Sequence, residues 1–210
     1  MKIYDISLTL SPELTTSPGE NFFNLESVKN FKDHQVNLSK VTLGNHNGTH
    51  IDAPLHFIEG GMGAREIDIE KLIGECQVLE IAPKTNLIEK EEIDGKISSE
   101  RVLFKTTNSN KLFEPFTSDY ISIGQSGAEY LVEKKVKLVG IDYFGCEAKG
   151  SPGHPVHTTL LKNKIVILEG IDLSQIEEGN YEIFVGALKI KGSDGAPARV
   201  FLSQSRHLIV

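Results

Sequence analysis

The sequence has no long run of apolar residues, which excludes a transmembrane helix, since such a helix needs about 20 of them in succession. The first residues also lack the apolar stretch and the cleavage site of a secretory signal peptide. We therefore expect a cytoplasmic protein that does not contact a membrane. Tryptophan is absent altogether, and the 210 residues carry a net charge of −7.

Basic clusters are missing too, apart from the run 133–137, which suits the C-terminal end of a helix, where cations interact favourably with the helix dipole. The sequence therefore predicts no nucleic-acid surface. There are only two cysteines, Cys76 and Cys146. In a cytoplasmic chain we expect both to be free thiols. We predict that Cys76 lies in the core, whereas Cys146 lies in a loop near other candidate functional residues.

Histidine, by contrast, is concentrated, because three of the seven lie between positions 46 and 56 with an aspartate among them. His46, His50, Asp52 and His56 share one parity, so an extended chain would direct all four to one face. In a straight strand His46 and His50 would lie ~13 Å apart, too far for one metal ion, so the chain must bend. We predict the bend at 47–48, because asparagine and glycine both tolerate positive φ.

This run predicts a metal site on the concave side of a loop at a strand end, because imidazole and carboxylate are common ligands of divalent transition metals. The alternative is a polar loop that holds no metal. A second group lies further along: His157 stands where a turn enters a short helix, and Glu169 ends an apolar run. Glu169 either faces a cleft or begins a solvated loop. Asp142 is either a carboxylate behind the ligands or a turn residue.

Short apolar runs rich in valine and isoleucine predict strands at 3–8, 41–43, 77–81, 101–105, 120–123, 137–141, 164–168, 181–187 and 200–202. Helices are predicted at 125–135, 67–73, 87–93 and, for one turn, 158–163. The first begins with a capping box from Ser126 to Glu129. This pattern predicts one mixed α/β domain over 1–210, with a barrel-like β core and helices outside. A Rossmann arrangement is disfavoured, because no Gly-x-Gly-x-x-Gly follows a strand.

The run from His46 to Phe57 closely resembles the motif His-x-Gly-Thr-His-x-Asp-x-Pro-x-His of the cyclase family of metal-dependent hydrolases, to which bacterial kynurenine formamidase and isatin hydrolase belong. Further segments resemble the family in the expected order, at 4–7, 18–19, 140–142, 154–161, 167–169 and 192–199. The resemblance implies a mixed α/β fold with a barrel-like β core, of the swivelling β/β/α type, and a homo-oligomer, either a dimer or a tetramer.

The resemblance also implies roles for individual residues. The residues that match metal ligands of the family are His46, His50, Asp52, His157 and Glu169. The first three match the ligands of one metal, and the last two match the residues that hold a second metal with the aspartate as a bridge. His56 matches the catalytic histidine, which is not a principal ligand. We expect one or two divalent ions, Zn²⁺ ahead of Mn²⁺, although mixed nitrogen and oxygen ligands suit several metals.

The implied activity is hydrolysis of an amide, either an arylformamide such as N-formylkynurenine or a cyclic amide, by a metal-activated water with His56 as general acid and base. The sequence departs from the family pattern at three points, which are Gly170, the loop 142–146 and the absence of tryptophan. These departures affect substrate choice more than metal chemistry. The alternative is a non-catalytic protein of the same fold that binds a metal or a small molecule. Phe57, Tyr143 and Phe144 flank the ligand segments, but no substrate-binding residue is assigned.

Overall fold

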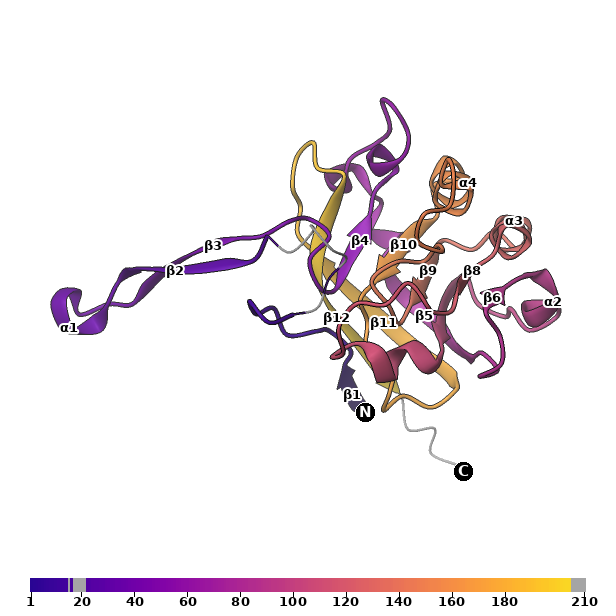
Figure 1. The fold of residues 1–210 in the computed structure, drawn as a ribbon, viewed down its shortest axis with the longest axis horizontal. Helices are drawn as coiled ribbons and strands as arrows, with labels where there is room; N and C mark the ends of the chain where they lie inside the picture. The colour runs from indigo at the N-terminus through magenta and orange to yellow at the C-terminus, as the bar shows by residue number, and fades with distance from the viewer. Residues whose placement is uncertain (15, 17–21, 205–210) are drawn as a thin grey trace.

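The computed structural model describes residues 1–14, 16 and 22–204, and a closed β-barrel lies at its centre (Figure 1). Segment 18–19 of the family resemblance lies outside the described residues. Seven strands follow one another around the barrel, and the last pairs again with the first. In that order they are β12 (Gly195–Gln204), β11 (Gly179–Ala187), β5 (Ile73–Glu80), β7 (Arg101–Lys105), β9 (Leu138–Ile141), β10 (Val166–Glu169) and β4 (His50–Asp52). β1 (Lys2–Asp5) is also paired with β12. The predicted mixed α/β fold with a barrel-like core is confirmed.

The barrel combines parallel and antiparallel pairings. β5, β7, β9 and β10 run parallel, whereas the pairings of β4, β11 and β12 are antiparallel. Every residue of β9 and β10 is buried, because the barrel interior covers one face of these strands and helices cover the other. β11 alternates between buried and exposed residues, since its outer face meets solvent. The strands predicted at 101–105, 137–141 and 164–168 correspond to β7, β9 and β10.

β12 closes the barrel because its two parts pair with different strands. Residues Gly195, Ala196 and Pro197 pair with β4, and the stretch after them pairs with β11. A Cβ atom at Gly195 would lie 2.7 Å from the carbonyl oxygen of Ile51 and 2.8 Å from the ring of His46. Glycine therefore allows β12 to approach β4 closely, and this contact places the loop before β12 beside the histidine run.

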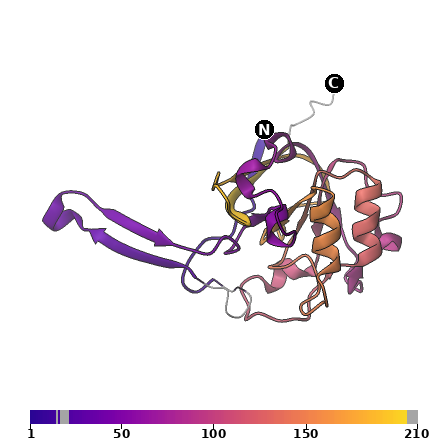
Figure 2. The same cartoon turned by 90° about the horizontal axis from the view of Figure 1, so that it is seen from above.

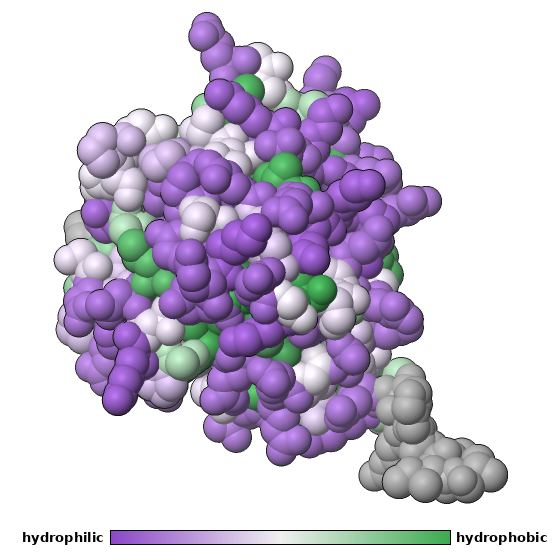
Figure 3. Space-filling view, turned by 90° about the vertical axis from the view of Figure 1, so that its right-hand side faces the viewer, coloured by the Kyte–Doolittle hydropathy of each residue, from purple (hydrophilic) through white to green (hydrophobic). Residues whose placement is uncertain are grey.

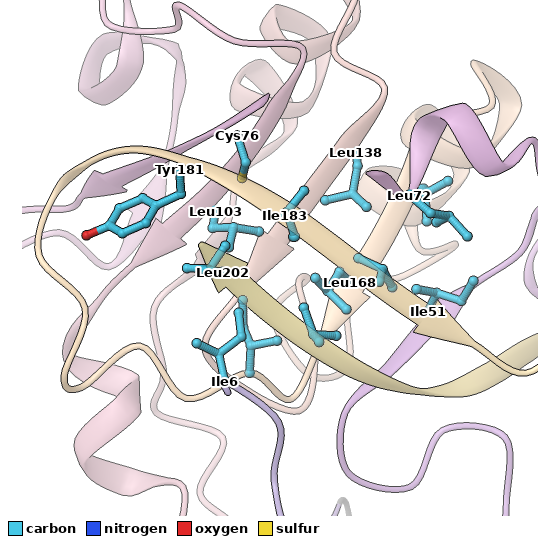
Figure 4. Packing of buried hydrophobic residues seen from close by; sticks show 14 of the residues in the cluster. Ile6, Ile51, Leu72, Cys76, Leu103, Leu138, Leu168, Tyr181, Ile183 and Leu202 are labelled. Atoms are coloured by element: carbon cyan, nitrogen blue, oxygen red, sulfur yellow. The ribbon is translucent and has the colours of Figure 1, made fainter. Parts of the chain in front are cut away.

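Two large hydrophobic cores, besides a smaller one around Tyr143, stabilise this arrangement. The first fills the barrel, where Ile51, Leu103, Leu168 and Leu202 from four different strands pack together (Figure 4). The second lies between the parallel strands and three helices, α2 (Lys90–Ile93), α3 (Gln125–Glu133) and α4 (Pro155–Lys162). Full burial of one such aliphatic side chain contributes about 1.5–3 kcal/mol. The outer, helix-covered side of the molecule is largely hydrophilic (Figure 3).

The three helices α2, α3 and α4 pack side by side on one side of the barrel (Figure 2). Their bounds differ in detail from the sequence prediction. α3 agrees with the helix predicted at 125–135, but the predicted capping box is wrong. The N-cap residue is Gly124, and the Ser126 hydroxyl donates to Glu89 at 2.6 Å instead. α4 begins earlier than the turn predicted at 158–163, because Pro155 suits the first position of a helix.

The remaining predicted helices are replaced by shorter elements. Segment 87–93 divides into β6 (Leu87–Ile88), which pairs with β8 (Ser122–Ile123), and α2. The helix predicted at 67–73 is wrong, because Asp68 starts a single 3₁₀ turn, η3 (Ile69–Lys71), and β5 begins at Ile73. Leu72 is still buried in the barrel core. The apolar residues of this segment therefore mark buried positions, although they do not lie on a continuous helix. The other 3₁₀ turns are η1 (Pro54–His56), η2 (Ala64–Glu66) and η4 (Thr107–Lys111).

A long arm projects from the barrel (Figures 1 and 2). It consists of β2 (Asn24–Lys29), α1 (Phe31–His34) and β3 (Leu38–Thr42), and every residue of these three elements is exposed. Sequence patterning predicted only the strand at 41–43, because β2 contains no apolar run. Among the described residues, no helix has both the length and the apolar character needed to cross a membrane.

Candidate metal centre

The histidine run enters the barrel wall through β4. Gly48 has a φ of +64°, which produces the bend expected at 47–48. His50 Nδ1 donates to the carbonyl oxygen of Gly48 at 2.9 Å, so in the neutral ring Nε2 is the unprotonated nitrogen. His50 Nε2 lies 3.5 Å from Asp52 Oδ1, and His46 Nδ1 lies 2.9 Å from the same oxygen. The bend therefore brings two imidazoles to one carboxylate.

Strand register brings the second predicted segment to the same place. Glu169 pairs with His50 across β10 and β4, and its Oε2 lies 3.4 Å from His50 Nε2. His157 comes from the start of α4, and its Nε2 lies 3.6 Å from Glu169 Oε1 and 3.8 Å from Asp52 Oδ2. The two segments, more than a hundred residues apart in the sequence, therefore meet at Asp52.

Three of the side-chain atoms at this meeting point lack hydrogen-bond partners. Among the described residues, the buried side-chain atoms without a partner are His50 Nε2, both carboxylate oxygens of Asp52 and Ser122 Oγ. The 2.9 Å contact of His46 with Asp52 lacks hydrogen-bond geometry. An unsatisfied buried polar group costs about 1–3 kcal/mol, and more if it is charged. Buried imidazole nitrogens and carboxylate oxygens that converge in this way are the donor set of a divalent transition metal, so these residues fit such a cation.

The electrostatics of the centre favour bound positive charge. Burial raises the pKa of Asp52, but the adjacent imidazoles of His46 and His50 outweigh it and hold that pKa well below its usual range. Burial and the Asp52 charge both raise the pKa of Glu169, yet His157 and His50 bring it to about 2. Burial lowers the pKa of His50, whereas Asp52 and Glu169 raise it to about 10. A bound cation would replace the positive charge of the protonated imidazoles beside the two carboxylates. The imidazoles would then be neutral, as metal binding requires.

Glu147 holds His157 in position. Its carboxylate is 4% exposed, and it accepts the Nδ1–H of His157 at 2.6 Å and the backbone N–H of Val156 at 2.9 Å. Because Nδ1 donates to Glu147, Nε2 of His157 is the nitrogen that faces Asp52. Carboxylates commonly orient metal-binding histidines in this way. No pattern in the sequence predicts this role of Glu147, since the contact forms only when the loop after β9 folds back onto α4.

His56 and Asp194 lie at the mouth of the centre. The rings of His56 and His46 stack, with centroids 4.0 Å apart and planes at 24°. Asp194 Oδ2 lies 2.9 Å from His46 Nε2 and 3.3 Å from His56 Nδ1, and Asn45 donates to Asp194 Oδ1 at 2.7 Å. Burial lowers the pKa of His56, and the nearby carboxylates offset this only in part, so the ring is neutral at pH 7. Asp194, directly before β12, lies in the segment 192–199 that resembles the family.

Comparison with known proteins agrees with this geometry. The family model described as "Putative cyclase" (Cyclase) matches residues 4–148. A kynurenine formamidase from Erythrobacter litoralis (strain HTCC2594) is 33% identical over 204 residues, which cover 97% of this chain and 94% of that protein. The chain belongs to the Cyclase family. The family resemblance of the sequence is confirmed.

Solved structures show the same Cyclase fold. A "predicted metal-dependent hydrolase" from Bacillus stearothermophilus superposes with a TM-score of 0.83 at 34% identity, over 96% of this chain and 97% of that one. An isatin hydrolase bound to the product analogue thioisatinate has a TM-score of 0.82 at 20% identity, over 96% and 91% of the two chains. This second likeness shows the fold alone.

In this Cyclase family member the centre opens into a cleft of about 420 Å³, a volume typical of small-molecule sites. Phe22, Phe57, Tyr120 and Phe144 give the cleft aromatic walls. Phe57 also packs against the second hydrophobic core, so it belongs to both the wall and the packing. Tyr143, a candidate for the wall, is fully buried and stacks beneath Tyr120 with ring centroids 4.5 Å apart.

Asp142 has a structural role in this Cyclase family chain. Its carboxylate accepts hydrogen bonds from the backbone N–H and the hydroxyl of both Thr106 and Ser109, at 2.6–3.2 Å. Burial nevertheless raises the pKa of Asp142 to about 6. The structure thus supports the second of the two predictions for Asp142, a turn residue, because it fixes η4 against the end of β9.

The backbone of this chain requires glycine at position 170 for a reason of space. Gly170 has a φ of +65°, and a Cβ atom there would overlap the carbonyl oxygen of Gly48. The Thr49 hydroxyl donates to the carbonyl oxygen of Gly170 at 2.5 Å and accepts the N–H of Leu8 at 2.8 Å. The end of β10 and the histidine turn therefore meet backbone to backbone, which positions Glu169 beside the histidines.

Proposed function

We propose that this chain is a metal-dependent hydrolase that cleaves amide bonds. The proposed metal ligands are His46, His50, Asp52, His157 and Glu169. The observation that carries the proposal is the set of buried, unpartnered atoms on His50 and Asp52, which face donors from a second segment. Relatives named kynurenine formamidase and a metal-dependent hydrolase with the same fold support the reaction class.

The position of Asp52 supports two cation sites that share its carboxylate. Oδ1 faces His46 and His50, whereas Oδ2 faces His157, whose Nε2 also lies near Glu169. One carboxylate can bridge two ions in this arrangement. We propose Zn²⁺ first and Mn²⁺ second, because imidazole and carboxylate ligands suit both and the histidine-rich set suits zinc better.

His56 is the proposed general acid and base. A divalent cation in the centre would lower the pKa of water and polarise an amide carbonyl. The neutral His56 ring lines the cleft beside the proposed ligands, so it can take a proton from the attacking water and deliver it to the leaving nitrogen. Asp194 lies 3.3 Å from His56 Nδ1, where it orients the ring and stabilises its protonated form.

The cleft supports an aromatic amide as substrate. Its aromatic walls can stack on a planar ring while the amide reaches the centre. This favours arylformamides such as N-formylkynurenine, the substrate class of tryptophan catabolism, or fused cyclic amides such as isatin-like lactams. The cleft has no tryptophan, so Phe57 and Phe144 would make the contacts with the ring.

The test compares turnover and metal content. His56→Gln should lower kcat by about 10²–10⁴-fold, the usual contribution of general acid–base catalysis, and leave the metal content unchanged. Asp52→Asn should lose both turnover and metal. His34→Gln, on the exposed arm, is the matched control and should change neither. A metal-loaded wild type that hydrolyses no arylformamide, lactam or cyclic imide would contradict the proposal in favour of a binding protein.

We further propose a cytoplasmic homo-oligomer, a dimer or a tetramer, that assembles through the arm. A two-stranded hairpin is only marginally stable alone in water, yet this arm exposes Leu25, Val28, Phe31 and Val41. A second copy of the chain could cover these side chains. Both cysteines are unpaired, which suits a reducing compartment.

The oligomer proposal is tested by light scattering. Leu25 and Val41 face each other across β2 and β3, so the double variant Leu25→Ser, Val41→Ser should dissociate the assembly and leave the barrel folded. The control is Lys40→Ser with Glu26→Ser, an exposed ion pair on the same strands. A wild type that is monomeric at all concentrations would refute the proposal.

A further inference from the structure

Cys146 is a buried thiol beside the proposed second cation site. It is 1% exposed, and its Sγ lies 3.5 Å from His157 Nε2. The same nitrogen lies 3.6 Å from Glu169 Oε1 and 3.8 Å from Asp52 Oδ2. The ligand atoms of Cys146, His157 and Glu169 all lie within 4.8 Å of one another. The thiol therefore faces the space toward which the proposed ligands converge.

The backbone of Cys146 is tied to the same ligands. Its N–H donates to Glu169 Oε1 at 2.6 Å, which fixes both the loop and the carboxylate. Independently, both carboxylate oxygens of Asp52, which is 1% exposed, have no hydrogen-bond partner, and Oδ2 lies 3.8 Å from His157 Nε2. Buried acceptors in native proteins almost always have a partner. Acceptors without one therefore point to a bound ion at this place.

We propose that Cys146 Sγ is a ligand of the second cation, together with His157, Glu169 and the bridging Asp52. This inference rests on the proposed function, since it assigns a further ligand to the same centre. As the sulfur–metal bond forms, the S–H bond breaks and the proton passes to solvent, so the ligand is the thiolate.

A thiolate ligand would make the two cation sites unequal. Thiolates favour zinc and other soft cations, whereas Mn²⁺ and Mg²⁺ prefer oxygen ligands. Within the described part of the chain, the site at His46 and His50 has only nitrogen and oxygen donors near it, so it should accept a wider range of metals. We therefore expect zinc or cadmium to fill the Cys146 site, and manganese to fill it poorly.

The chain supplies a matched control in its other cysteine. Cys76 is equally buried and unpaired, but it lies on β5, where its Sγ contacts the carbonyl oxygen of Gln77. Cys76 belongs to the core that fills the barrel, whereas Cys146 belongs to the core on the helix side. A sulfur signal from bound metal can therefore be assigned by substituting either cysteine alone.

The experiment loads the full-length protein with Co²⁺ and records absorption and metal content. Wild type and Cys76→Ser should show a near-ultraviolet sulfur-to-cobalt charge-transfer band, and Cys146→Ser should lose it. Cd²⁺ titration should show weakening of one site by more than about tenfold in Cys146→Ser, because even partners that only orient a ligand contribute about 10–100-fold. The Cd²⁺ affinity of the other site should stay unchanged.

The outcomes separate this inference from the proposed function. If wild type binds cobalt without a sulfur band, the thiol is not a ligand, although the hydrolase proposal stands. If elemental analysis finds no metal bound to wild type, the proposed function itself fails, and this inference with it. Because the band is read in wild type, misfolding of Cys146→Ser would not block the test, and Cys146→Ala provides a second variant. A band that persists in both Cys146 variants would also overturn the inference.

Discussion

Replacing Glu147 by glutamine tests how the centre is held together. The carboxylate uses one oxygen for the N–H of Val156 and the other for the Nδ1–H of His157. Glutamine has only one carbonyl oxygen, so one of these two donors must face an NH₂ group. If the oxygen stays on Val156, His157 can be satisfied only by moving its proton from Nδ1 to Nε2. That proton would then point at the proposed metal.

The magnitude follows from these two arrangements. Removing a carboxylate that orients a metal-binding histidine typically costs about 10–100-fold in metal affinity. This corresponds to about 1.4–2.7 kcal/mol. If glutamine instead keeps the contact with His157, its NH₂ group faces the N–H of Val156. An unsatisfied buried donor costs about 1–3 kcal/mol, which would appear as lower stability of the fold.

The assay is competition for Zn²⁺ with a chromophoric chelator, combined with urea unfolding of the metal-free protein. Glu147→Gln should show weaker binding of one ion, a lower free energy of unfolding, or both. Glu91→Gln, on the exposed side of α2, is the matched control and should match wild type in both measurements. If Glu147→Gln binds every ion as tightly as wild type and unfolds at the same urea concentration, Glu147 does not orient His157.

Three further predictions concern stability. Asp142→Asn should lower the free energy of unfolding by about 1–3 kcal/mol in urea, because the new NH₂ group faces donors from Thr106 and Ser109. With its pKa raised to about 6, Asp142 contributes less to stability as pH rises from about 4 to 6, so over this range wild type should lose stability relative to the variant. Gly170→Ala should lower the free energy of unfolding by more than about 1–2 kcal/mol, since alanine would have to adopt the left-handed conformation and its Cβ would overlap the backbone of Gly48. An unchanged melting temperature would refute this. Finally, Zn²⁺ at 100 times its Kd should raise the free energy of unfolding by about 2.7 kcal/mol, or the Tm by roughly 5–10 °C, relative to chelator-treated protein. Equal melting curves would contradict a metal site in the folded state.

The strands that are buried on both faces were the easiest to predict from the sequence. β7, β9 and β10 each contain an apolar run, because the barrel interior covers one face and the helices cover the other. Such runs are visible without a structure. The arm could not be found in this way, because exposed strands such as β2 need no apolar pattern. The segment 67–73 misled the prediction, because apolar side chains at helical spacing reached the core from a single turn followed by a strand.

The local part of the centre was readable because its residues are neighbours in the sequence. His46, His50 and Asp52 share one parity, and the bend at Gly48 brings them together. Glu169 required knowledge of register, since it joins the centre only by pairing with His50 across two strands. Asp194 could not be placed from the sequence, because its contact with His46 depends on the closure of the barrel by β12.

The most direct test of this account is anomalous X-ray diffraction from crystals grown with Zn²⁺ and measured on both sides of the zinc absorption edge. We expect anomalous density bounded by the Asp52 carboxylate, His50 Nε2, His157 Nε2 and Glu169, at about 2.0–2.2 Å from nitrogen and oxygen ligands. A crystal with zinc elsewhere, or with these side chains in the same positions and no anomalous density among them, would contradict the assignment of this centre as a metal site.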